Sequence, residues 1–419
     1  MKVSIFSTYD TDGGAAIATL RLFRGLRSIG VDATMVVQRK FSDDPYVKSA
    51  HTTLRKIEGI VRPYVDSASL RRYPQRGKAL FSPAAVPDRI RGAIAETNPD
   101  ILHFFWMNGG FLRIETLKNI ARPVVWTLHD MWPFTGGCHY DAECGRYRHS
   151  CGACPALGST KERDLSRKIW QRKHAAWAGV PIVVVATSQW IADMAKASTI
   201  FRNKRIELIP NNVEIGRYKP VDKGTARDVW NLPRDKQLVL FSAFSATSDK
   251  RKGHELLTAA IRALVTLGYA ANMEMVVIGA SQAPSGMPDL GVKVNYVGRL
   301  YDELSQVLLY SAADVVVAPS MQENLSNTVM EAMACGTPVV AYNIGGMPDM
   351  IDHLENGYLA KAFDTEDLAQ GIRWVLQQTG ESSSLNVHAR QTVVSRYNKE
   401  RVAKLNFALY EDILAKRSI

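Results

Sequence analysis

The stretch that decides the fold is Ser320-Met321-Gln322-Glu323-Asn324-Leu325-Ser326-Asn327-Thr328-Val329-Met330-Glu331-Ala332-Met333-Ala334-Cys335-Gly336-Thr337-Pro338. It follows a β-branched run at residues 314–318, which predicts a strand buried on both faces. Ser326 is a good N-cap for a helix over 327–335, and Gly336 ends that helix. The apolar run 338–342 predicts the next strand. The stretch therefore predicts one strand–loop–helix–strand unit of a parallel sheet.

A ligand site is expected in the loop of this unit. Ligands bind at the carboxyl ends of parallel strands in open α/β sheets, and the free N–H groups of a helix N-terminus favour an anion. Two carboxylates flank this N-terminus: Glu323 lies in the loop before the cap, and Glu331 lies about one turn into the helix. We predict a diphosphate on the N–H groups, with one carboxylate reaching toward each end of the ligand.

This pair of glutamates, separated by seven residues, resembles the signature of retaining glycosyltransferases of the group-one type (family four), which have the GT-B fold. The resemblance implies that Glu323 faces the donor sugar and Glu331 holds the ribose hydroxyls of the nucleotide. A solvated helix face is the alternative for such spacing. The position between two buried strands favours the functional interpretation. The implied donor-binding loop contains Asn324, Leu325, Ser326 and Asn327, of which the last two offer their backbone to the diphosphate.

Size and composition limit the possible classes of protein. The chain has 419 residues with 46% hydrophobic and 22% charged content, which predicts a soluble protein of two or three domains. Its net charge of +11 suits a phosphorylated ligand or an anionic membrane surface, although a scattered solvated excess fits as well. Nucleic acid is not an expected partner, because no Lys/Arg block interleaved with aromatic residues occurs.

The expected location of the protein in the cell follows from two kinds of apolar segment that the sequence lacks. Neither a signal-peptide core nor an apolar run of spanning length is visible in the sequence. We expect a cytoplasmic protein, with peripheral contact at the inner face of the cell membrane as an option.

Strands alternate with helices along both halves, which predicts two doubly wound, Rossmann-like α/β domains. The resemblance implies that these domains face each other across a cleft. We place an acceptor-side domain at 1–212 and a nucleotide-sugar-binding domain at 213–397. The amphipathic helix in 398–419 is expected to pack back onto the first domain. The basic segment 41–86 is interpreted as a variable insertion facing the acceptor, with an ordinary surface loop as the alternative.

Three residues of the first domain are candidates for the site. Gly13 and Gly14 follow the first strand and let the backbone approach a ligand closely, although the full G-x-G-x-x-G fingerprint is absent. A plain tight turn is the alternative. The resemblance implies that this Gly-Gly meets the donor diphosphate. His129 ends a buried strand, and the resemblance places it close to the donor sugar. His103, on a neighbouring strand, is interpreted as structural.

A basic loop in the second domain is the expected diphosphate clamp. The family pattern has Gly-Arg after a strand and Lys-Gly several residues later. Lys252 and Gly253 match the second part, whereas small and hydroxyl residues at 245–247 stand where the Arg is expected. Arg251 or Lys250 could supply the missing charge. A departing diphosphate needs compensating cations, so Lys252 is the predicted catalytic cation. A solvated basic loop is the alternative.

Two further segments resemble parts of the family's donor site. Gly298, Arg299 and Leu300 resemble the segment that frames the nucleotide base. The turn 345–349 resembles the family's Gly-Gly-x-Pro-Glu turn, with Asp349 in place of the Glu.

Four cysteines cluster after His129. A Cys-x-x-Cys pair with two more cysteines in a short loop fits a tetrahedral zinc, with His139 and His149 as possible substitute ligands. Two disulfides are disfavoured in a reducing cytosol, and thiols without metal remain the other alternative. We predict a structural zinc that would leave no open position for catalysis, and we expect no catalytic metal. Its ligands would be Cys138, Cys144, Cys151 and Cys154.

The resemblance implies a retaining glycosyltransferase that moves a sugar from a UDP- or GDP-sugar to a saccharide or lipid-linked acceptor. We expect it to build bacterial exopolysaccharide or lipopolysaccharide. A nucleotide-sugar epimerase of the same fold is one alternative. A non-catalytic sugar-nucleotide-binding subunit is another, because the diphosphate-binding Arg is missing.

Overall fold

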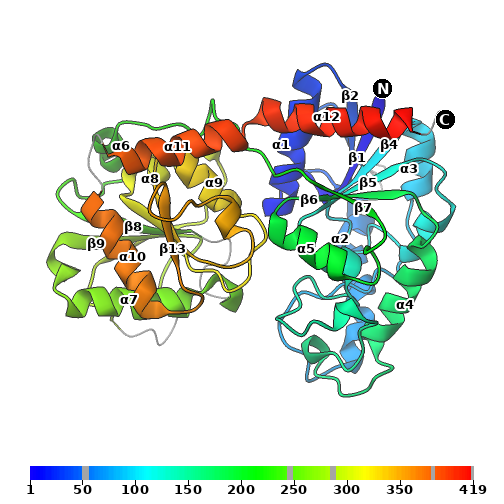
Figure 1. The fold of residues 1–419 in the computed structure, drawn as a ribbon, viewed down its shortest axis with the longest axis horizontal. Coiled ribbons are helices and arrows are strands. Elements are labelled where there is room, and N and C mark those ends of the chain that lie inside the picture. The colour runs from blue at the N-terminus through cyan, green and yellow to red at the C-terminus, as the bar shows by residue number, and fades with distance from the viewer. Residues whose placement is uncertain (50–55, 243–248, 284–288, 379–382, 417–419) are drawn as a thin grey trace. The chain divides into compact units, whose positions relative to one another are not determined.

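The computed structural model describes residues 1–49, 56–242, 249–283, 289–378 and 383–416. The chain divides into two compact units, one comprising Met1–Asn211 with Glu400–Ile419 and the other Asn212–Lys399. Each unit is a parallel sheet with helices on both faces (Figure 1). The predicted fold class, two doubly wound α/β domains, is confirmed. Among the helices in the described ranges, none is both long and apolar enough to cross a membrane.

The N-terminal unit contains a seven-stranded parallel sheet in the order β3-β2-β1-β4-β5-β6-β7. The chain leaves β1 toward β2 and later returns to the other side of β1 with β4. The loops after β1 and β4 therefore flank the switch point, where ligands bind in such sheets. The strands are β1 (Lys2–Tyr9), β2 (Asp32–Arg39), β3 (Val47–Ser49), β4 (Ile101–Phe104), β5 (Val124–Leu128), β6 (Ile182–Ala186) and β7 (Arg205–Leu208).

Two helices of this unit begin at residues whose side chains cap the first turn. Asp164 and Ser188 accept hydrogen bonds from the first turns of α4 and α5. The α-helices are α1 (Gly14–Ser28), α2 (Lys56–Asp66), α3 (Ile90–Thr97), α4 (Leu165–Trp177), α5 (Gln189–Ala197) and α12 (Lys399–Ala415). Short 3₁₀-helices are η2 (Ser67–Arg72), η3 (Ile114–Asn119), η4 (Trp132–Phe134), η5 (Arg146–Arg148) and η6 (Pro155–Leu157).

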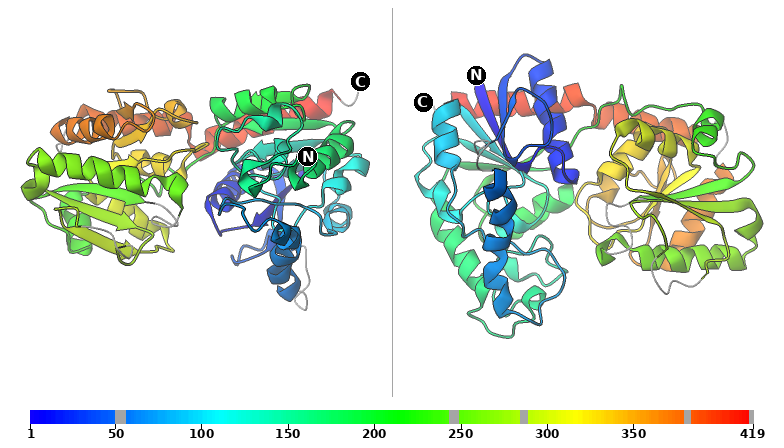
Figure 2. Two further views of the ribbon diagram at one scale, coloured as in Figure 1. Left: turned by 90° about the horizontal axis from the view of Figure 1, so that it is seen from below. Right: turned by 180° about the vertical axis from the view of Figure 1, so that it is seen from behind.

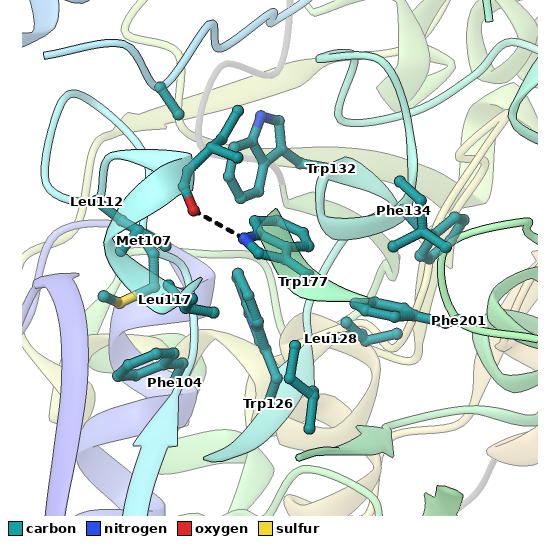
Figure 3. Packing of buried hydrophobic residues seen from close by; sticks show 14 of the residues in the cluster. Phe104, Met107, Leu112, Leu117, Trp126, Leu128, Trp132, Phe134, Trp177 and Phe201 are labelled. Atoms are coloured by element: carbon teal, nitrogen blue, oxygen red, sulfur yellow. Dashed lines mark hydrogen bonds between the residues drawn. The ribbon is translucent and has the colours of Figure 1, made fainter. Parts of the chain in front are cut away.

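Three tryptophans fill the core of this unit beneath the segment that follows β5 (Figure 3). The rings of Trp126 and Trp177 have centroids 5.1 Å apart, and Trp132 lies 6.1 Å from Trp177. The indole N–H of Trp177 donates to the backbone carbonyl of Ile114 at 2.9 Å. Aromatic rings bury a large apolar area in fixed geometry, so this packing anchors the chain just after His129.

The last helix, α12, belongs to the N-terminal unit from Glu400 onward. The hydroxyl of Tyr410 lies 2.6 Å from Nδ1 of His103, whose Nε2 lies 2.7 Å from the Thr127 hydroxyl. Tyr410 and His103 are both fully buried. His103 is therefore a structural residue that links β4, β5 and α12.

We expect acid to destabilise the N-terminal unit through His103. Burial lowers the pKa of His103 from 6.5 to about 3 in the folded chain. As the pH falls below 6.5, the unfolded chain takes up a proton at His103, whereas the folded chain does not until about pH 3. The free energy of unfolding should therefore fall by up to about 1.4 kcal/mol per pH unit across this window, as measured by urea denaturation.

The control for this pH dependence is His388→Gln, which changes an exposed histidine and should keep the wild-type slope. His103→Gln should flatten the slope. An equal pH dependence in His103→Gln and wild type would show that His103 does not carry it.

The C-terminal unit contains a six-stranded parallel sheet in the order β10-β9-β8-β11-β12-β13. Its switch point lies between β8 and β11, so the loops after these two strands meet there. The strands are β8 (Gln237–Ser242), β9 (Met273–Ile278), β10 (Val294–Gly298), β11 (Val315–Ala318), β12 (Val339–Tyr342) and β13 (Gly357–Ala360).

Helices cover both faces of this second sheet (Figure 2). The α-helices are α6 (Lys223–Val229), α7 (His254–Thr266), α8 (Glu303–Ala312), α9 (Asn327–Ala334), α10 (Thr365–Gln378) and α11 (Ser384–Arg396). The 3₁₀-helices are η7 (Lys250–Lys252), η8 (Tyr269–Asn272) and η9 (Met347–Asp349).

Candidate active site

The loop between β11 and α9 contains the predicted donor site. The hydroxyl of Ser326 accepts a hydrogen bond from the backbone N–H of Val329 at 3.4 Å, which caps α9 as the sequence predicts. No acidic residue occupies the first turn of α9. Glu323 lies in the loop before the cap, and Glu331 lies in the second turn with its side chain buried. The structure therefore places a capped helix N-terminus between the two glutamates at the switch point of the sheet.

Lys252 and Glu323 form an ion pair across this switch point. Nζ of Lys252, on the loop after β8, donates to Oε2 of Glu323 at 2.5 Å. Burial would by itself raise the pKa of Glu323, but the ammonium of Lys252, helped by Arg251, holds that pKa below its usual value. Glu323 is therefore a carboxylate at neutral pH, and Lys252 carries a cation beside the N-terminus of α9.

Two glycines bring the backbone of this loop close to its neighbours. Gly253 has φ +70°, and a Cβ added there would lie 1.8 Å from the carbonyl oxygen of Pro319. Gly345 has φ +53°, and its added Cβ would lie 1.9 Å from the carbonyl oxygen of Glu323. The N–H of Gly346 donates to that same oxygen at 3.2 Å. Only glycine fits both the conformation and the space, so these contacts fix the backbone that carries Glu323.

Tyr310 on α8 positions Glu331 and was not identified from the sequence. Its hydroxyl donates to Oε2 of Glu331 at 3.3 Å, and its own carbonyl accepts from the Thr337 hydroxyl at 2.6 Å. Burial, together with the charge of Glu331, raises the pKa of Tyr310 well above its usual value, so the phenol stays protonated. A tyrosine within the largely apolar helix 303–312 is the signal that could have revealed it.

The other two predicted cations of the clamp differ in their surroundings. Arg251 is paired with Asp249 at 2.6 Å, and Lys250 is exposed. Residues 245–247, where the family's Arg is expected, lie outside the described residues.

The predicted base-framing segment begins at the end of an edge strand. Gly298 ends β10 with φ +73°. The guanidinium of Arg299 lies 5.3 Å from the centroid of the exposed Tyr301 ring, and Leu300 packs against the apolar core. In the sheet, β9 and β8 lie between β10 and β11.

In the N-terminal unit, Gly13 and His129 both lie at the carboxyl edge of the sheet. Gly13 precedes α1 with φ +94°, and a Cβ added there would meet nothing within 4 Å. Nε2 of His129 lies 3.2 Å from the side-chain oxygen of Asn211. Within the described part of the chain, Nδ1 of His129 has no hydrogen-bond partner. Burial, only partly offset by Asn211 and Asp130, lowers the pKa of His129 to about 4, so its imidazole is neutral at pH 7.

Asp130 and His139 form a buried polar network beside His129. Nδ1 of His139 lies 2.6 Å from Oδ2 of Asp130, which also accepts from the indole N–H of Trp106 at 2.9 Å. Nε2 of His139 lies 2.9 Å from the Ser82 hydroxyl and 3.0 Å from the amide nitrogen of Asn108. Both ring nitrogens of His139 are thus engaged, which argues against the suggestion that it replaces a cysteine as a zinc ligand. The suggested substitute His149 is exposed.

The four clustered cysteines line one small cavity, together with Asp141 and Thr135. All four are free thiols, so no disulfide joins any two of them. Burial raises the pKa of Cys151 to about 12 and raises the pKa of the other three thiols above the usual value. Among the described residues, no group of three or more His, Cys, Asp or Glu side chains is arranged to hold a metal ion. A closed zinc site would require the thiols to converge on the metal, and zinc stays a prediction.

Elemental analysis of freshly purified, reduced protein tests the zinc prediction. We expect about one zinc per chain, because four cysteines would complete a tetrahedral site. Cys151→Ser should lose the metal, whereas Cys335→Ser, which changes a buried cysteine outside the cluster, should retain it. A chain free of zinc, or zinc that stays bound in Cys151→Ser, would remove the prediction.

Two family models match this chain. The model described as "Glycosyltransferase Family 4" matches residues 12–217, and the model described as "Glycosyl transferases group 1" matches residues 236–378. Together, the two models cover most of the N-terminal unit and the sheet of the C-terminal unit. The second model includes the loop of Glu323 and the helix of Glu331.

Curated relatives carry the name D-inositol 3-phosphate glycosyltransferase. The protein from Saccharomonospora viridis is 27% identical over 227 residues, which are 50% of this chain and 51% of the relative. The protein from Corynebacterium aurimucosum is 25% identical over 400 residues, or 90% of this chain and 87% of the relative. The match to the first relative thus spans about half of its length, whereas the second match extends over nearly the whole of both chains.

Solved structures share the fold. Sucrose-phosphate synthase from Thermosynechococcus elongatus has a TM-score of 0.69 at 21% identity, covering 99% of both chains. Anabaena HepE, crystallised with UDP, has a TM-score of 0.63 at 17% identity, covering 98% of this chain and all of that one. The architecture is therefore GT-B, as the resemblance implied. With the two family models, this shows that the chain belongs to the group 1 glycosyltransferases, family 4.

Proposed function

We propose that this chain transfers a sugar, with retention of anomeric configuration, from a nucleotide-diphosphate sugar to a saccharide or lipid-linked acceptor. The ion pair of Lys252 with Glu323 beside the capped N-terminus of α9 carries the proposal. This arrangement offers a cation and the N-terminus of a helix to a leaving diphosphate, at the switch point where α/β sheets bind ligands. No metal is required for charge neutralisation in this proposal.

The transition state of such a transfer has oxocarbenium character and a departing diphosphate. Lys252 and the backbone of Ser326 and Asn327 would stabilise the charge that develops on the diphosphate. Glu323, fixed as a carboxylate by Lys252, would face the cationic sugar ring and accept from its hydroxyls. Glu331, held by Tyr310, would accept from the ribose hydroxyls.

The family resemblance assigns the residues of the N-terminal unit to the same donor. His129 would face the donor sugar, and its neutral imidazole adds no positive charge beside an oxocarbenium-like ring. The backbone of Gly13, where an added Cβ would meet nothing within 4 Å, would meet the diphosphate together with Gly14.

A UDP-sugar is the first donor to test, because HepE was crystallised with UDP and with UDP-glucose. A GDP-sugar is the second. We place the acceptor in bacterial exopolysaccharide or lipopolysaccharide synthesis.

An assay of nucleotide release separates the three candidate functions. Release of free nucleotide diphosphate that depends on the presence of acceptor supports sugar transfer. Conversion of the donor sugar without acceptor would indicate an epimerase, and donor binding without turnover would indicate a non-catalytic subunit.

Glu331→Ala should weaken binding of the nucleotide about 10- to 100-fold, because ribose hydroxyls would lose a charged acceptor. Isothermal calorimetry with UDP, GDP and ADP measures this affinity. Glu355→Ala is the matched control, since Glu355 is exposed on the same unit. Unchanged affinity in Glu331→Ala would refute the ribose contact.

A further inference from the structure

Helix α2 in the N-terminal unit is polar on its inner side. Arg62 is buried and donates to the carbonyl of Gly110 at 2.9 Å and to the side chain of Glu58 at 3.0 Å. One turn later, the buried Asp66 accepts from the backbone N–H groups of Ala84 and Ala85 at 3.1 and 2.8 Å. Residues 58, 62 and 66 are spaced by four, so they share one face of the helix. That polar face, not an apolar one, attaches α2 to the unit.

The opposite face of α2 is apolar and exposed. Ile57 is 71% exposed and Tyr64 is 73% exposed, and the side chains of Ile60, Val61 and Val65 between and beside them are exposed as well. Their spacing of three and four residues makes one continuous stripe. An amphipathic helix on a globular protein normally buries its apolar stripe, so a stripe turned outward marks an interaction site.

A cationic segment continues directly from this stripe. The 3₁₀-helix η2 follows α2 without a break, and in it Arg71 and Arg72 are exposed. Arg76 and Lys78 beyond it are exposed, and so is Leu80. Between residues 67 and 87 the sequence contains no Asp or Glu. The chain therefore continues from the apolar stripe into a segment with four exposed basic side chains and no acidic one.

We propose that α2 and the segment 71–80 form a membrane-docking surface that binds anionic lipid. Apolar side chains at the helix surface enter the boundary between headgroups and acyl chains, while adjacent Lys and Arg attract anionic headgroups. A protein partner of ordinary composition would leave four basic side chains next to the apolar stripe without a matching charge. An anionic bilayer satisfies both features at once.

This surface also indicates which acceptor the enzyme uses, an inference that rests on the proposed function. The inner face of α2 contacts the carboxyl edge of the sheet: Arg62 lies 3.2 Å from the Gln38 side chain at the end of β2, and Gly110 follows β4. Buried Gly59 lets the helix backbone approach the end of β2, because a Cβ there would lie 3.1 Å from Arg39. Docking through α2 would hold this edge near the bilayer, which favours the lipid-linked acceptor over a free saccharide.

Flotation with vesicles tests the proposal. The full-length protein is mixed with vesicles of phosphatidylcholine alone or of phosphatidylcholine with phosphatidylglycerol. We expect binding to the anionic vesicles that salt weakens, since exposed charge attraction is screened. The double variant Ile57→Ser with Tyr64→Ser should lower the bound fraction about tenfold or more. The matched control, Val229→Ser with Leu267→Ser, changes two comparably exposed apolar residues of the C-terminal unit and should bind like wild type.

Two results would overturn the proposal: wild-type protein that floats with neither vesicle, or a double variant that binds as wild type does. A dimer of the wild type that Ile57→Ser with Tyr64→Ser dissociates in analytical ultracentrifugation would instead assign the stripe to a second copy of this chain. Nucleotide affinity by calorimetry is measured on the same variants. Lost flotation with unchanged affinity separates membrane docking from a failure of the proposed donor site.

Discussion

Replacing Lys252 with alanine should lower the turnover number about 10²- to 10³-fold, the loss expected when a preorganised charge at a developing anion is removed. Lys252 holds its ammonium 2.5 Å from Glu323 at the N-terminus of α9. A substrate diphosphate that gains charge as it leaves would need that cation more in the transition state than in the ground state. Donor affinity should therefore change less than turnover, in steady-state assays of nucleotide release.

Lys219→Ala is the matched control for this variant. Lys219 is exposed on the same unit and is not one of the predicted cations of the clamp, so its removal should leave turnover close to wild type. Lys252→Ala also leaves Glu323 without its cation, and thermal unfolding of the variant measures how much stability this loss costs. Wild-type kinetics in Lys252→Ala would remove it from the site.

Gly345→Ala should lower the rate of transfer about 10²-fold or more while most of the C-terminal unit stays folded. The substitution puts a side chain on a residue with φ +53° and a Cβ 1.9 Å from the carbonyl oxygen of Glu323. The neighbouring atom is backbone, so the loop that carries Glu323 must shift. A displacement of about 1 Å at a reacting group can cost about 10²-fold in rate.

Gly268→Ala isolates the conformational part of this effect. Gly268 also has a positive φ, +88°, but a Cβ there would meet nothing within 4 Å. It should therefore cost only about 1–2 kcal/mol of stability, without loss of transfer. Comparing circular dichroism and nucleotide release for the two variants checks this. Wild-type activity in Gly345→Ala would show that the loop position is not critical.

Much of the C-terminal fold could be predicted because its signals are local. The β-branched run 314–318 indicated a strand buried on both faces, and the structure has β11 at Val315–Ala318. Ser326 and Gly336 marked the two ends of a helix, and α9 spans Asn327–Ala334. Such patterns depend on chain stiffness, capping and burial within a few residues, which the sequence records directly.

The partners of the site residues could not be predicted in the same way. The sequence indicated Lys252 as a cation for the diphosphate, and only the adjacency of β8 and β11 shows that it contacts Glu323, 71 residues away. Tyr310 reaches Glu331 because α8 packs beside α9. For His139, metal binding was one option from cysteine spacing, whereas its ring nitrogens contact Asp130 and Ser82.

The sequence by itself determined that this protein has two parallel α/β domains, and it placed two glutamates at either side of a helix N-terminus. Tertiary structure alone decided which charges pair and which surfaces stay exposed. Helix α2 shows the reason most clearly: the stripe from Ile57 to Val65 has the spacing of a core-facing helix, yet Arg62 and Asp66 attach its opposite side. Spacing defines the faces of a helix, but only long-range contacts decide which face is turned inward.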